Sequence, residues 1–174
     1  IFLGIFSIVF LTLVFWMPKA VRNYTAEILP EVKHIEIGNK LFEQLKRVTG
    51  PACEADFSKT ALKYLSQRLF TEETRIFIVP DGIKTTKNLP GNILLANRNL
   101  VEDFEDPDVL AGYLVVEKLR SETYNPIEEL LQNISLISTF RLLTTGLIND
   151  ETLMDYADYL VTKPQEIVQS SEII

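Results

Sequence analysis

The sequence predicts an α+β domain, mostly helical with a small antiparallel sheet, on one N-terminal transmembrane helix. Three observations support this prediction: an uncharged apolar run at the start, helical spacing of apolar residues over most of the chain, and short strand-like runs between turn signatures near the middle. With 174 residues the chain has the length of one domain. We expect a transmembrane anchor at 1–17, a connector at 18–34, the folded domain at 35–163 and a tail at 164–174.

The composition excludes several classes of protein. A net charge of −7 argues against a nucleic-acid binder, because such proteins need a basic surface that neutralises phosphates. A single cysteine excludes an internal disulfide and any zinc site of the CxxC type. A single histidine excludes the catalytic metal sites that need two. We therefore expect no metal and no other cofactor.

Residues 1–17 contain no charged side chain, and about 20 such residues usually span a bilayer. Trp16 ends the run, and Lys19 and Arg22 follow it, which is typical of a membrane–water interface. A cleaved signal peptide is the alternative, but no small-residue cleavage site follows Met17. We expect a single-pass membrane protein in contact with lipid. The two basic residues alone favour a cytoplasmic domain; the usual export arrangement of such an anchor favours the extracytoplasmic side, which we expect.

The residues after the connector predict two helices and then a sheet. Apolar residues recur three and four apart over 35–48 and again over 56–70, and Gly50 and Pro51 end the first of these helices. The period then changes to short apolar or β-prone runs at 75–79, 83–86 and 93–96, which are separated by turn signatures at 80–82 and 88–92. These runs predict the small antiparallel sheet.

The last part of the chain predicts helices. Asp106 is a good N-cap and Pro107 suits the first helical position, so a helix should run from there to about Ser121. Further helices are expected at 126–133, 135–147 and 150–163, and Pro164 ends the last one.

The stretch from 89 to 120 contains Leu89-Pro90-Gly91, an apolar strand, an acidic loop and the helix that Asp106 begins. It resembles the membrane-associated zinc metallopeptidases of the HtpX type, which are gluzincins. The resemblance implies that the helix corresponds to the one that carries the motif H-E-x-x-H. It also implies that substrate would lie extended along an edge strand formed by Ile93, Leu94, Leu95 and Ala96.

The chain departs from this family at the residues that hold the metal. The motif falls on Val116, Glu117 and Arg120: valine has no donor atom, and arginine is a permanent cation that would repel Zn²⁺. The third ligand of the family would fall on Met154. Only the glutamate is kept, and we expect Glu117 to pair with Arg120 within the helix. The resemblance therefore implies the scaffold of a metallopeptidase without its metal or its chemistry.

These observations predict a non-catalytic protein that acts as an accessory or scaffold subunit and binds other membrane protein subunits. Two alternatives remain open. One is a peptide-binding module that uses the former substrate groove along residues 93–96, which the tail at 164–174 would then be able to occupy. The other is a membrane-bound peptidase.

Overall fold

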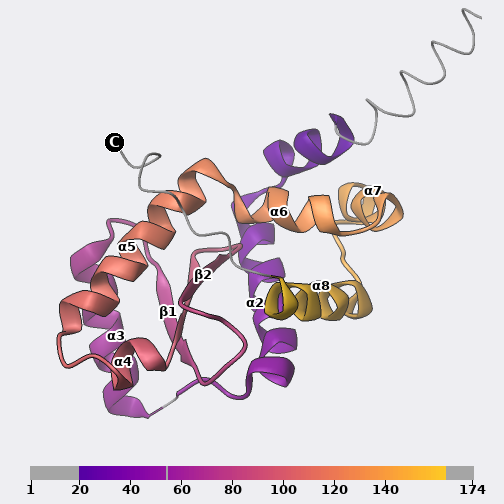
Figure 1. The fold of residues 1–174 in the computed structure, drawn as a ribbon. Coiled ribbons are helices and arrows are strands. Elements are labelled where there is room, and N and C mark those ends of the chain that lie inside the picture. The colour runs from indigo at the N-terminus through magenta and orange to yellow at the C-terminus, as the bar shows by residue number, and fades with distance from the viewer. Residues whose placement is uncertain (1–19, 54, 164–174) are drawn as a thin grey trace, which may run out of the picture.

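The computed structural model describes residues 20–53 and 55–163, which form an α+β domain with helices on both faces of a three-stranded sheet (Figure 1). The predicted anchor at 1–17 and the tail at 164–174 lie outside the described residues. Within the described ranges, no helix combines the length and the hydropathy that crossing a bilayer requires.

Residues 20–28 are helical and precede the named elements. In chain order these are α2 (Glu31–Thr49), α3 (Asp56–Leu69), β1 (Arg75–Val79), β2 (Thr86–Leu89), β3 (Ile93–Asn97), α4 (Asn99–Glu102), α5 (Pro107–Thr123), α6 (Pro126–Asn133), α7 (Leu136–Thr145) and α8 (Asp150–Thr162). The helices predicted after residue 34 and the strands at β1 and β3 are confirmed to within a few residues. The strand predicted at 83–86 lies later, as β2, and α4 was not predicted.

The sheet is mixed, with strand order β1-β3-β2. β1 runs parallel to β3, with Arg75 opposite Ile93, and β2 runs antiparallel to β3, with Leu89 opposite Ile93. The prediction of an antiparallel sheet is therefore wrong for the β1–β3 pair. The cause is the central place of β3: all five of its residues are buried, so the chain places this strand between the other two.

The two faces of β3 belong to different cores. Ile93 and Leu95 lie in the larger core, which α2, α6 and α8 complete. Leu94 and Ala96 lie in a smaller core with side chains of α3, α4 and α5. Figure 1 shows the corresponding arrangement, with α3, α4 and α5 on one side of the sheet and α2 and α8 on the other. The sheet is thus covered on both faces, and α5 is held against β2 and β3.

The segment predicted as a connector at 18–34 is largely helical where it is described. Residues 20–28 form a helix, and α2 begins at Glu31 rather than at 35. Thr25 and Ala26 are buried, and Ala26 belongs to the larger core. Packing of these side chains therefore makes the segment part of the domain, which apolar periodicity alone did not indicate.

A close contact fixes α2 against the turn between β2 and β3. A Cβ atom placed on Gly38 of α2 would lie 1.9 Å from the carbonyl oxygen of Pro90. Gly91 has a φ of 73°, and a Cβ there would lie 2.5 Å from the Cα of Ile35. Only glycine permits this approach, so the turn is fixed in the position from which β3 enters the sheet.

Candidate functional site

Glu117 lies in the middle of α5, on the face that packs against the sheet. Asp106 begins this helix as expected: its Oδ1 accepts a hydrogen bond from the backbone N–H of Asp108 at 2.9 Å. Glu117 is only 7% exposed, and its Oε1 accepts a hydrogen bond from the backbone N–H of Asn88 in β2 at 2.9 Å. The carboxylate therefore faces the edge of the sheet rather than solvent.

The partner of Glu117 differs from the one predicted. We expected Arg120 on the same helix, but the hydrogen bond comes from the backbone of β2. Burial raises the pKa of Glu117, and the hydrogen bond from Asn88 and the charges of Lys87 and Arg120 oppose that rise. The buried carboxylate thus satisfies an edge-strand N–H that would otherwise be buried without a partner.

The two positions that would hold a metal in the resembled family carry no ligand atom. The Val116 side chain is 40% exposed on α5. Arg120 lines a cavity of about 200 Å³ together with Lys84, Lys87 and Glu129. Lys87 Nζ and Glu129 Oε2 lie 2.7 Å apart in a half-buried ion pair. Cations thus predominate around the second position, which makes it unfavourable for Zn²⁺.

Met154, at the position of the third ligand, lies elsewhere. Its sulfur accepts a hydrogen bond from Arg47 Nη1 at 3.2 Å, at the contact between α8 and α2. The part of α8 that approaches Arg120 is its C-terminal end, residues 160–162. His34, the single histidine, lies on α2, and burial lowers its pKa. Among the described residues no three histidine, cysteine, aspartate or glutamate side chains gather as a metal site would require.

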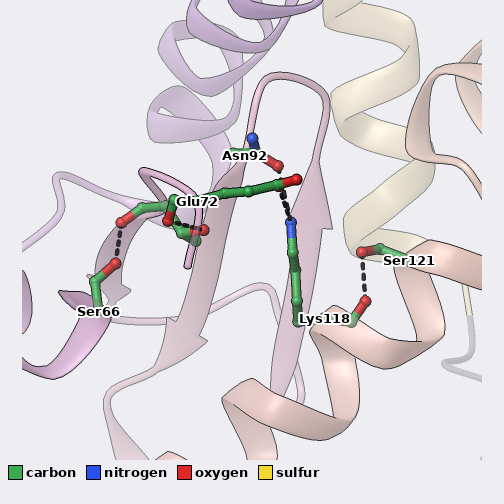
Figure 2. Close-up of polar contacts among 6 residues, drawn as sticks. Ser66, Glu72, Asn92, Lys118 and Ser121 are labelled. Carbon is green, nitrogen blue, oxygen red and sulfur yellow. Dashed lines mark hydrogen bonds and ion pairs between the residues drawn. The ribbon is translucent and has the colours of Figure 1, made fainter. Parts of the chain in front are cut away.

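Lys118 is a residue of this helix that the sequence analysis missed. Its Nζ lies 3.2 Å from Glu72 Oε2 and 3.0 Å from Asn92 Oδ1, as Figure 2 shows. Asn92 follows Gly91 in the β2–β3 turn and has a φ of 56°. Lys118 thus joins α5 to this turn and to the loop before β1. In the sequence, only its position directly after Glu117 pointed to a role for Lys118.

The predicted partner-binding strand is not an edge. Ile93, Leu94, Leu95 and Ala96 are each fully buried, and β3 is hydrogen-bonded to β1 on one side and to β2 on the other. The interpretation of residues 93–96 as an exposed docking edge is therefore wrong. At the true edges, Glu117 binds the outward N–H of Asn88 in β2, and the Cys53 N–H donates to the Ile78 oxygen of β1 at 2.9 Å.

Comparison of the chain with protein-family models and with curated proteins gives no match.

Proposed function

We propose that this chain is a non-catalytic, metallopeptidase-like protein that acts as an accessory or scaffold subunit of a membrane protein complex. Residues 1–17 anchor it as a single-pass protein, with the domain on the extracytoplasmic side. The observation that carries the proposal is the hydrogen bond between Glu117 and the backbone of Asn88. This bond gives the one glutamate kept from the resembled motif a role in the fold.

The chemistry of a metallopeptidase argues for the same proposal. A glutamate that activates a metal-bound water must reach that water, and the metal must be held by neighbouring donor atoms. Glu117 is only 7% exposed. Val116 and Arg120, which lie one helical turn from each other on either side of it, offer no atom that binds a metal. The helix therefore supports the domain instead of binding a metal.

The alternative of a peptide-binding module is weakened by the position of β3. That alternative needs a strand with free backbone groups, and residues 93–96 use theirs within the sheet. The proposal of a subunit does not depend on that strand, because subunits associate through the anchor and through the surfaces of the helices.

The test is extraction of the tagged full chain from its own membranes in a mild detergent, followed by sizing and quantitative mass spectrometry. A single-pass protein with the same tag, expressed at the same level, controls for chance association. We expect one or more membrane proteins at a fixed ratio to the chain and absent from the control. A monodisperse monomer would contradict the role as a subunit.

The sidedness of the domain is tested separately by adding protease to oriented vesicles. Cleavage of the domain only when the protease acts from the extracytoplasmic side is the expected result. Cleavage only from the cytoplasmic side would reverse the proposed orientation and leave the proposed subunit role in place.

A further inference from the structure

Helix α7 exposes large apolar side chains on one face. Ile137 is 82% exposed and Phe140 is 61% exposed, three residues apart, and Leu136 beside them is 41% exposed. The opposite face holds Thr139 and Leu142, which are 0% and 1% exposed and anchor the helix to the domain. The exposed apolar face therefore points away from the core that Leu142 joins.

This helix also differs from the rest of the chain in charge. Residues 134–148 contain one charged side chain, Arg141, and no acidic one, whereas the whole chain has 24 acidic residues and a net charge of −7. An apolar face that carries no acidic residue and has a cation beside it suits the interface of a bilayer, where apolar side chains enter the acyl chains and a cation meets lipid phosphates. Arg141 is exposed, so its guanidinium is free to reach lipid phosphates.

The position of α7 relative to the start of the described chain points the same way. Two residues before α7, at the C-cap of α6, the Ile134 oxygen accepts a hydrogen bond from Arg22 Nη2 at 3.4 Å. At the end of α7, a Cβ atom placed on Gly146 would lie 3.2 Å from the Lys33 side chain. Figure 1 shows α7 beside the helical residues 20–28, the first described residues after the apolar run at 1–17. The residues that flank α7 thus lie close to Arg22 and Lys33, in the segment that follows the predicted anchor.

We infer that α7 lies flat in the membrane–water interface beside the anchor, with Ile137 and Phe140 among the acyl chains and Arg141 at the phosphates. The inference rests on the anchor in the proposed function. A second copy of the chain fits this face less well. A helix of ten residues offers a face of about 15 by 10 Å, roughly 150 Å², while a stable interface buries about 800 Å² on each partner.

The test uses the full chain in phosphatidylcholine vesicles. Cys53→Ser removes the native cysteine, so that a label attaches only to an introduced one. An environment-sensitive fluorophore is attached to Ile137→Cys or, separately, to Phe140→Cys. Phe57→Cys is the matched control, because Phe57 is an aromatic residue that is 86% exposed on α3. Vesicle flotation and the melting curve of each variant establish membrane association and folding.

We expect a blue-shifted emission that brominated lipids quench for the labels at 137 and 140, and an aqueous spectrum for the label at 57. Aqueous labels at 137 and 140 in a chain that floats with the vesicles would overturn the inference and leave the anchor in place. A shift that grows with protein density and is not quenched by brominated lipid would overturn it in favour of a second copy. A chain that does not float would refute the anchor, and the inference with it.

Discussion

Glu117 is the residue whose replacement tests its structural role. Glu117→Leu keeps much of the side-chain volume but removes the acceptor for the Asn88 N–H, which lies 2.9 Å away in a buried site. A buried donor left without a partner costs about 1–3 kcal/mol. Glu117→Gln keeps an oxygen at the same reach. We therefore expect the leucine variant to lose about 1–3 kcal/mol of unfolding free energy and the glutamine variant to lose much less.

The assay is urea denaturation of the detergent-solubilised chain at pH 7, followed by circular dichroism, with thermal melting as a second measurement. For a domain of this size, each kcal/mol corresponds to about 2–4 °C in melting temperature. Equal stability of the leucine variant and the wild-type protein would refute the argument that the hydrogen bond to Asn88 supports the fold.

Two further predictions concern pH and close packing. Burial raises the pKa of Glu117 above 4.5, so folding favours the protonated carboxyl. The stability linked to that protonation is full below about pH 4.5 and is lost as the pH rises through the folded pKa, whereas the oxygen that accepts from the Asn88 N–H is present both below and above that pKa. The unfolding free energy of the wild-type protein should therefore fall relative to Glu117→Gln between pH 4 and 7, and a constant difference would contradict this. Gly38→Ala should cost about 1–3 kcal/mol or more, because its Cβ would lie 1.9 Å from the Pro90 oxygen. Gly112→Ala, with nothing within 4 Å, should stabilise α5 by about 0.5–1 kcal/mol; denaturation curves in which both variants shift the same way would contradict the packing argument.

Features that depend on neighbouring residues were predictable from the sequence. Asp106 and Pro107 fix the start of α5 because a cap and a first-turn proline act within one turn of chain. The apolar run at 93–96 likewise indicated a strand, although not its central place in the sheet.

Features that depend on distant residues were not predictable. The partner of Glu117 is a backbone group 29 positions away, whereas Arg120 is the neighbour that helical spacing suggests. Asn88 indicated a turn, yet it lies 5% exposed inside β2, because α5 covers that edge of the sheet. The order of the strands depends on which run is buried on both sides, and strand propensity carries no information on that.

We propose that helix α5, which resembles the helix of a metallopeptidase motif, supports the fold and binds no metal. The most direct test is the zinc content of the purified full chain, determined by elemental mass spectrometry after dialysis, together with cleavage of casein by the wild-type protein and Glu117→Gln. We predict less than stoichiometric zinc and no cleavage by either protein. One tightly bound zinc per chain, with cleavage that Glu117→Gln abolishes, would contradict this role of α5.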